Sequence, residues 1–194
     1  MNDPYVDPET GLLRNRLGIR DSLLLSRAEA DLSHLGLTEL DRRPLPGGYD
    51  LAHLRAFHRA IFGDLYPWAG ELRTVEIAKS HAFCPARNIV SYGRDVFRRL
   101  ARNGRLRGLE PDAFVRELAD LLGDINALHP FRDGNGRAQR AFVAQLARDA
   151  GYRIQWAGLD AEANVAASVA AHHGDNGPLR DLLAPLVHRG ARND

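Results

Sequence analysis

Apolar residues recur every three or four positions along most of this chain, which is the spacing of amphipathic helices. Asp21 is suited to cap the first of these helices and Gly36 to stop it, while Asp50 and Gly63 bound the second. Pro130 disfavours helical geometry at the residue before it, so a later helix should end there. The pattern predicts helices over residues 22–35, 50–62, 88–103, 111–128, 135–150, 160–173 and 178–187.

One segment has a different period. From Leu72 to Ala78 apolar and polar side chains alternate, with β-branched residues among them, which is typical of a strand. Lys79-Ser80-His81 is suited to a turn, and Ala82-Phe83-Cys84 to a returning strand. We therefore expect a β-hairpin over about residues 72–84, the only β structure that the sequence predicts. The predicted fold is an all-α bundle with this one small hairpin.

The composition is that of an ordinary globular protein, with 44% hydrophobic and 26% charged residues among 194. No internal repeat or long linker divides the chain, so a single domain over 1–194 is expected. Residues 1–49 would form an N-terminal arm and helix, and residues 50–190 the core that carries the hairpin.

The charge is nearly balanced, with 26 basic against 25 acidic side chains and a formal net charge of +1. This balance argues against a broad face for binding nucleic acid directly. The one cysteine, Cys84, permits no internal disulfide. No signal peptide and no apolar run of membrane-spanning length is visible, so the sequence predicts a cytoplasmic protein without membrane attachment.

The chemistry of the chain is concentrated in residues 129–140, His-Pro-Phe-Arg-Asp-Gly-Asn-Gly-Arg-Ala-Gln-Arg. Gly134 and Gly136 allow a sharp turn and close approach of a ligand to the backbone. The free N–H groups at the start of the following helix favour an anion. Arg137 and Arg140 are three residues apart, hence on one helical face near that end. The segment therefore predicts a phosphate site.

Two further residues of this segment extend the prediction from binding to catalysis. Asp133 supplies a carboxylate oxygen, and Mg²⁺ prefers one or two such ligands together with phosphate oxygens and water. His129 belongs to the side-chain type that titrates closest to neutrality, as a general base should. A base, a metal ligand and an anion site within twelve residues indicate phosphoryl or nucleotidyl transfer.

Each of these features has a simpler explanation when taken alone. Residues 133–136 could form only a turn and a helix cap, the histidine before Pro130 could be structural, and the arginines could be solvated. The segment would lack a functional site only if all of these simpler explanations held at once. It matches neither a P-loop nor a dinucleotide-binding glycine motif. Elsewhere, Cys84, the His172-His173 pair and the two tryptophans are more simply explained as structural residues.

Residues 129–140 resemble the Fic (filamentation induced by cAMP) family, whose signature HPFx[DE]GNGRxxR they match at every specified position. The resemblance continues, more loosely, over nearly the whole chain. It includes Trp68-Ala69-Gly70, Pro85-x-Arg87-Asn88-Ile89 and the opening segments Asp3-Pro4-Tyr5 and Leu13 to Leu17, as in short bacterial Fic toxins.

The resemblance implies a protein adenylyltransferase, which transfers AMP from ATP to a Tyr, Ser or Thr hydroxyl of a target protein. His129 would deprotonate that hydroxyl, Phe131 would anchor the loop, and Asp133 would hold Mg²⁺ against the phosphates. Gly134, Asn135 and Gly136 would form an anion hole at the α-phosphate. Arg137 and Arg140 would bind the outer phosphates.

The predicted hairpin takes the place of the family's target-docking flap. Ile77, Ala78 and Lys79 would pair with a target segment as an added strand, and Lys79 and Ser80 would also contact the nucleotide. For short toxins of this class, the resemblance suggests the ATPase subunits of DNA gyrase or topoisomerase IV as targets.

One family feature is missing. Many Fic proteins carry an inhibitory helix, [ST]xxxE[GN], but none of the eight glutamates in this chain is followed by Gly or Asn. The resemblance thus implies a toxin whose small antitoxin supplies the inhibitory glutamate to Arg140. Two alternatives stay open: a Fic-fold phosphotransferase or other nucleotidyltransferase, and a non-catalytic ATP-binding partner module.

Overall fold

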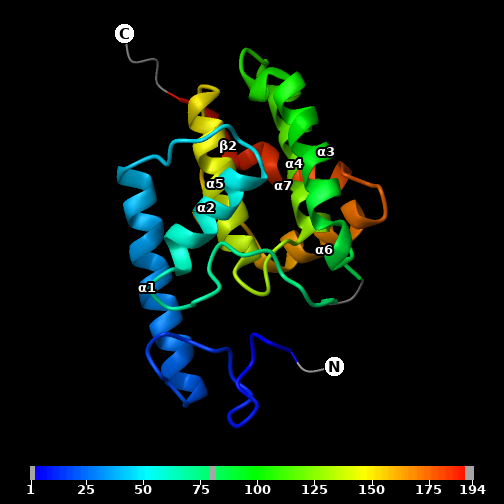
Figure 1. Cartoon of the computed structure of the whole chain (residues 1–194). Coiled ribbons are helices and arrows are strands. Elements are labelled where there is room, and N and C mark those ends of the chain that lie inside the picture. The colour runs from blue at the N-terminus through cyan, green and yellow to red at the C-terminus, as the bar shows by residue number, and fades with distance from the viewer. Residues whose placement is uncertain (1–2, 79–81, 191–194) are drawn as a thin grey trace.

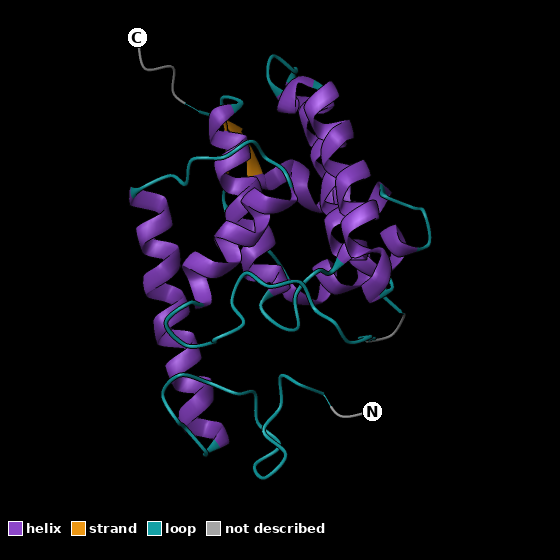
Figure 2. Ribbon diagram, in the orientation of Figure 1, coloured by secondary structure: helices purple, strands orange, loops and turns teal. Residues whose placement is uncertain are grey.

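A computed structural model gives the architecture and describes residues 3–78 and 82–190. Within these residues the chain is a bundle of α-helices with one two-stranded sheet (Figures 1 and 2). The helices are α1 (Ser22–Arg42), α2 (Leu51–Phe62), α3 (Ile89–Arg102), α4 (Pro111–Leu128), α5 (Asn135–Asp149), α6 (Ala161–His172) and α7 (Gly177–Leu183). The prediction of an all-α bundle with one small β element is therefore confirmed.

Helix α5 forms the centre of the bundle and packs against α2 and α4, while α1 runs along the outer side of α2 (Figure 1). Its buried residues Ala138, Phe142 and Leu146 recur every four positions, the spacing of an inward helical face. Phe142 has no exposed surface and makes ring contacts with residues of α2 and α3, including Phe57 and Phe97. The core therefore fixes the helix that begins at residues 129–140.

Helix α1 is longer than predicted, because Gly36 does not stop it. The helix continues to Arg42. A Cβ atom on Gly36 would lie 2.9 Å from the carbonyl oxygen of Ala60 and 2.9 Å from the Cα atom of Ile61. Gly36 thus allows close crossing of α1 and α2, and it is not a helix terminator.

The predicted hairpin at 72–84 is not formed as two regular strands. Of the described residues, Ala78 and Ala82 form an isolated antiparallel bridge, the N–H of Phe83 donates to the carbonyl oxygen of Ile77 at 3.5 Å, and residues 72–77 form no strand. The turn residues Lys79, Ser80 and His81 lie outside the described residues. The alternating pattern belongs to a segment that packs against the bundle. Its backbone groups bond to other parts of the chain: the N–H of Arg73 donates to the carbonyl oxygen of Pro130, and the carbonyl oxygen of Val75 accepts from the side chain of Arg73.

The regular sheet lies where the sequence predicted no strand, and only Val187 of it falls within a predicted helix, residues 178–187. Strand β1 (Tyr152–Ile154) pairs antiparallel with β2 (Val187–Arg189). The predicted helix over 178–187 ends at Leu183 and passes into a 3₁₀ turn over Ala184–Leu186. Pro185 explains the early end, because proline in a helix interior removes a hydrogen bond and clashes with the preceding turn.

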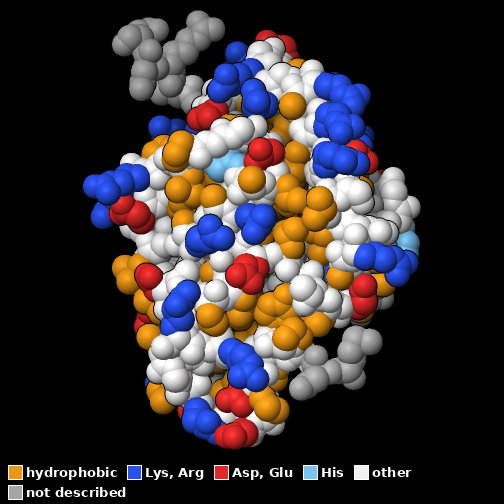
Figure 3. Space-filling view, viewed as in Figure 1, with side chains coloured by type: hydrophobic (Ala, Val, Ile, Leu, Met, Phe, Trp, Pro, Cys, Tyr) orange, Lys and Arg blue, Asp and Glu red, His pale blue; other side chains and the backbone are white. Residues whose placement is uncertain are grey.

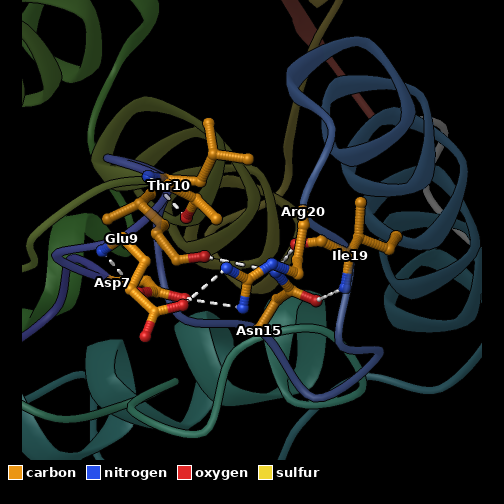
Figure 4. Close-up of polar contacts among 8 residues, drawn as sticks. Asp7, Glu9, Thr10, Asn15, Ile19 and Arg20 are labelled. Atoms are coloured by element: carbon orange, nitrogen blue, oxygen red, sulfur yellow. Dashed lines mark hydrogen bonds and ion pairs between the residues drawn. The ribbon is translucent and has the colours of Figure 1, made fainter.

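The N-terminal arm, residues 3–20, is irregular as predicted, and local polar contacts organise it (Figure 4). The side chain of Asn15 accepts a hydrogen bond from the N–H of Ile19 at 2.9 Å and donates one to its carbonyl oxygen at 2.9 Å. Arg20 donates to Glu9 at 2.7 Å and lies 3.9 Å from Asp7. These contacts fold the arm back before α1 begins.

Acidic and basic side chains are interspersed on the face shown in Figure 3, so that face carries no extended field of one sign. This agrees with the nearly balanced charge. Among the described helices, none combines the length and the apolar character needed to cross a bilayer.

Candidate active site

The loop between α4 and α5 has a conformation that its sequence dictates. Helix α4 ends at Leu128, and His129 takes the left-handed conformation, with φ 42° and ψ 62°. Gly134 is left-handed as well, with φ 76°, immediately before the first residue of α5, Asn135. These two reversals of the backbone place His129 and the N-terminus of α5 at one end of the bundle. The predicted C-terminal end of α4 and the predicted N-terminal start of α5 are confirmed.

The side chain of Asn135 closes the loop on itself. It accepts a hydrogen bond from the N–H of Phe131 at 2.9 Å and donates one to the carbonyl oxygen of Phe131 at 2.7 Å. Phe131 is buried and stacks on the ring of His58, with 3.9 Å between the ring centroids. Phe131 therefore anchors the loop in the core, and the amide of Asn135 is committed to the loop itself.

His58, on α2, supports the loop from below and was not identified from the sequence. Its Nε2–H donates to the carbonyl oxygen of Asp133 at 2.9 Å, and its Nδ1 accepts from the N–H of Gly70 at 2.9 Å. Both bonds need the neutral ring with the proton on Nε2. Burial lowers the pKa of His58 to about 4, with a smaller contribution from the charge of Arg137. The ring therefore stays neutral at physiological pH.

This histidine predicts a pH dependence of stability. Below pH 6.5 the unfolded chain gains a proton on His58 that the folded chain does not take up until about pH 4. The free energy of unfolding should fall by up to roughly 3 kcal/mol through this window from His58 alone. Urea unfolding of the wild type and of His58→Gln at pH 7 and pH 5 measures the difference in slope. The exposed His34→Gln is the control, and equal pH slopes for wild type and His58→Gln would refute the assignment.

The imidazole of His129 is held in one orientation. Its Nδ1 lies 3.3 Å from the carbonyl oxygen of Asn126, and its ring stacks on Phe83 with 3.7 Å between centroids. A carbonyl oxygen only accepts, so Nδ1 carries the hydrogen and Nε2 has the lone pair when the ring is neutral. This is the tautomer that a general base requires.

Arg73 connects the 72–84 segment to the loop between α4 and α5, and it too was missed from the sequence. Its side chain is fully buried and donates to the carbonyl oxygens of His129 at 2.8 Å, Val75 at 2.8 Å and Cys84. Its backbone N–H donates to the carbonyl oxygen of Pro130 at 2.9 Å. One guanidinium group thus satisfies carbonyls that the left-handed turn and the flap leave unpaired.

A cavity of about 540 Å³ opens over this loop. Its wall contains every described residue that the sequence predicted for the site: His129, Asp133, Gly134, Asn135, Gly136, Arg137 and Arg140, with Ile77 and Ala78 from the flap. Lys79 and Ser80, also predicted, lie outside the described residues. The described residues that the sequence predicted for the site therefore all line one cavity.

A second cavity, of about 440 Å³, adjoins the first and shares its residues Phe83, His129, Gly136 and Arg140. The rest of its wall is mostly apolar and comes from α4, α6, α7 and the segment that follows β1; it includes Trp156, Leu159, Val165, Val169 and Leu182. Asn126 and Asn164 add amide groups to this wall. None of these positions belongs to a recognisable motif, so the sequence did not reveal this cavity.

The two arginines of α5 differ in their partners. Arg137 donates to Glu29 and, at 3.0 Å, to Ser33, and its guanidinium carbon lies 4.6 Å above the ring centroid of Phe62. Arg140 has no hydrogen-bond or ion-pair partner among residues 3–78 and 82–190. Burial, together with the like charge of Arg137, lowers the pKa of Arg140 from its ordinary value. A partly desolvated, unpaired cation lining both cavities favours an anion there.

Asp133 fits a magnesium ion that arrives with a nucleotide. Its carboxylate lines the larger cavity, and Oδ1 accepts the N–H of Gly134 at 2.5 Å. In the part of the chain that the structure describes, no three acidic, histidine or cysteine residues gather to form a protein-only metal site. Magnesium commonly uses one or two carboxylates and completes its shell with phosphates and water, so a single carboxylate suffices.

Gly136 gives a test that separates fold from function. An added Cβ would lie 3.3 Å from an Nη atom of Arg140, at the edge shared by both cavities, whereas the backbone there is helical. Gly136→Ala should therefore keep or raise the melting temperature, because alanine favours helix by roughly 0.5–1 kcal/mol over glycine. ATP affinity should fall, because the methyl group intrudes on the ligand space.

The matched control is Gly134→Ala. There the Cβ would lie 2.4 Å from a ring carbon of Phe62 and φ is positive, so the fold itself should weaken. Thermal melting and calorimetric ATP titration measure both variants. A Gly136→Ala protein that binds ATP like the wild type would contradict the placement of phosphates at this edge.

The structure is thus a helical bundle with a cavity lined by a histidine and two arginines, and comparison with known proteins identifies its family. A model of the Fic/DOC family matches residues 48–147. The chain is 37% identical to the probable protein adenylyltransferase Fic of Escherichia coli K12, across 99% of this chain and 96% of that protein. It is 41% identical to the protein adenylyltransferase VbhT of Bartonella schoenbuchensis, across 97% of this chain but 39% of that longer protein.

Solved structures agree. The N-terminal Fic domain of a putative cell filamentation protein from Bartonella quintana, with bound ADP, superposes with a TM-score of 0.89 at 26% identity, over 96% of this chain and 95% of that one. BepC from Bartonella tribocorum, with bound AMPPNP, shares the fold with a TM-score of 0.87 at 24% identity, over 95% and 96%. This chain belongs to the Fic/DOC family.

Proposed function

We propose that this chain is a protein adenylyltransferase, which transfers AMP from ATP to a hydroxyl side chain of a target protein. The observation that carries the proposal is Arg140, an unpaired and partly desolvated cation at the N-terminal end of α5, beside His129. The cavity offers a triphosphate backbone N–H donors and guanidinium groups, and it offers the attacking hydroxyl a base. The relatives named as adenylyltransferases support the same activity.

The reaction follows from these positions. Nε2 of His129 takes the proton from the target hydroxyl, and the hydroxyl oxygen attacks the α-phosphorus of ATP. The bond from the α-phosphorus to the oxygen that bridges the α- and β-phosphates breaks, and pyrophosphate leaves with that bond's electron pair. The N–H of Gly136, in the first turn of α5, faces the negative charge that grows on the α-phosphate oxygens, whereas the N–H of Gly134 is taken up by Asp133.

The outer phosphates lie at Arg137 and Arg140, which orient the leaving group opposite the attacking oxygen. Asp133 would hold a magnesium ion, which would supply positive charge against the phosphates. The adenosine lies in the second cavity, because that cavity adjoins the α-phosphate position and has an apolar wall with amide groups for base recognition.

The protein substrate docks along the flap. Ile77 and Ala78 line the larger cavity, as His129 does, in a segment that forms a single isolated bridge and no strand within the described residues. A target segment adding to this edge as a strand would bring its hydroxyl to His129. The suggested gyrase or topoisomerase IV subunit is a candidate for this role.

Control by a separate antitoxin is part of the proposal. Arg140 has no acidic partner in the described chain, whereas Arg137 has Glu29. A glutamate supplied by a partner protein would find Arg140 available and would displace a phosphate from it. The purified chain should accordingly be active without any mutation; inactivity that only a mutation within the chain relieves would argue against this control.

Labelled ATP tests the activity. The chain, with Mg²⁺ and a bacterial lysate as a source of hydroxyl-bearing targets, should attach label from the α-phosphate to protein and none from the γ-phosphate. Transfer of the γ-label would favour the phosphotransferase alternative. ATP binding without transfer of either label would favour a non-catalytic module.

A further inference from the structure

Helix α1 contributes to the phosphate site although it lies entirely outside the matched family segment, residues 48–147. Its residues Glu29 and Ser33, one turn apart, both accept hydrogen bonds from the guanidinium of Arg137. The contacts join residues 108 and 104 positions apart in the sequence. In Figure 1, α1 runs along the side of the bundle next to α2. The hydrogen bonds to Arg137 place Glu29 and Ser33 near the start of α5.

We propose that Glu29, assisted by Ser33, is a positioning residue that holds Arg137 in place for the outer phosphates of ATP. The inference rests on the proposed nucleotide-binding function and adds a residue to its machinery. Glu29 does not contact the nucleotide in this account; it acts through Arg137.

The carboxylate of Glu29 is itself fixed on both oxygens. Oε1 accepts from Arg137, and Oε2 accepts from the hydroxyl of Tyr66. Burial, and secondly the bond to Glu29, raise the pKa of Tyr66, so its hydroxyl remains a donor. The side chains of Arg137 and Glu29 are 26% and 20% exposed, which limits screening of the pair by solvent. An arginine held by a fixed carboxylate loses less conformational entropy when a phosphate binds.

The geometry distinguishes positioning from inhibition. Arg137 lines the larger cavity, but neither Glu29 nor Ser33 does. The carboxylate therefore approaches Arg137 from the side away from the ligand space and does not occupy a phosphate position. The ring of Phe62 covers a further face of the guanidinium, at 4.6 Å from its centroid. The remaining N–H groups are the ones left for the cavity.

The chain supplies a matched control. Asp41 and Arg148 form a second ion pair between α1 and α5, at 3.0 Å, near the opposite end of the two helices. Arg148 lines neither of the two cavities at the site. Asp41→Asn removes an α1–α5 ion pair without touching the site, so it reports what loss of interhelical attachment alone would do.

The test compares Glu29→Ala, Asp41→Asn, Arg137→Ala and the double variant Glu29→Ala/Arg137→Ala in the full chain. Calorimetry gives the affinities for ATP and for adenosine, and the α-label assay gives KM and kcat. We expect Glu29→Ala to weaken ATP binding and raise the KM for ATP roughly tenfold, the scale of one charge-assisted hydrogen bond. Adenosine binding should stay within about twofold, as should every parameter of Asp41→Asn.

The double variant decides whether Glu29 acts through Arg137. We expect it to bind ATP with the affinity of Arg137→Ala, because Glu29 contributes to ATP binding only through Arg137 and has no further effect once Arg137 is removed. Additive losses, an ATP affinity in Glu29→Ala equal to that of Asp41→Asn, or a gain of activity in Glu29→Ala would each overturn the proposal. Should the wild type bind ATP but transfer nothing, the proposed activity fails, and the binding data still judge the role of Glu29.

Discussion

His129→Ala is expected to lower the rate of AMP transfer by roughly 10²–10⁴-fold, the range for loss of a positioned general base. Nδ1 of His129 donates to the carbonyl oxygen of Asn126, which leaves Nε2 as the basic nitrogen over the cavity. Without it, the target hydroxyl keeps its proton and attacks poorly. The left-handed backbone at this position tolerates alanine at some cost, but Arg73 and the Asn135 contacts continue to hold the loop.

The affinity for ATP should change by less than about threefold in the same variant, because the proposed site binds the phosphates through α5 and its arginines. The rate is measured by α-label transfer and the affinity by calorimetry. His34→Ala, an exposed histidine on α1, is the control for removal of an imidazole. Transfer at the wild-type rate by His129→Ala would exclude His129 as the base.

Arg140→Ala is expected to have the second large effect, a loss of ATP affinity of roughly 10- to 100-fold. Arg140 is partly desolvated and has no partner among the described residues, so its electrostatic cost is recovered only when an anion binds. Its removal should therefore leave the free energy of unfolding within about 1 kcal/mol of the wild type, or raise it. A residue that served the fold would show the reverse: intact affinity and lower stability.

Arg116→Ala, at an exposed position on α4, is the matched control. Urea unfolding and calorimetric titration with ATP in Mg²⁺ provide the two readouts. If Arg140→Ala destabilised the fold while binding ATP like Arg116→Ala, Arg140 would be a structural residue and the proposed phosphate site would lose its main support.

The described residues that the sequence selected line one cavity because most of them are adjacent in the chain. The glycines, the proline and the helix boundaries of residues 129–140 are local features, and they keep His129 within six residues of the start of α5. Contacts from distant residues, His58 and Arg73, then support the loop. The helix starts at Asp21 and Asp50 were predictable for the same reason, because each side chain caps the N–H three residues on.

The parts that the sequence did not predict depend on contacts between distant segments. His58 reaches Asp133, and Glu29 reaches Arg137, over separations that no local pattern records. Glycine is a residue type that commonly ends helices, but Gly36 lies inside α1, where it allows the close approach of α2. The alternation in residues 72–78 indicates a strand, yet the carbonyl of Val75 accepts from the buried side chain of Arg73 and that of Leu72 from the hydroxyl of Tyr5, so no regular ladder forms.

The most direct test of the central claim, that residues 129–140 form an AMP-transfer site, is the composition of the group attached to the target. The chain is incubated with Mg²⁺, bacterial lysate and ATP that carries one label in the adenine and another in the α-phosphate, with His129→Ala in parallel. We predict that both labels become covalently bound to protein in equal molar amounts and that His129→Ala attaches neither. Bound phosphate without adenine, or equal labelling by His129→Ala, would contradict the account.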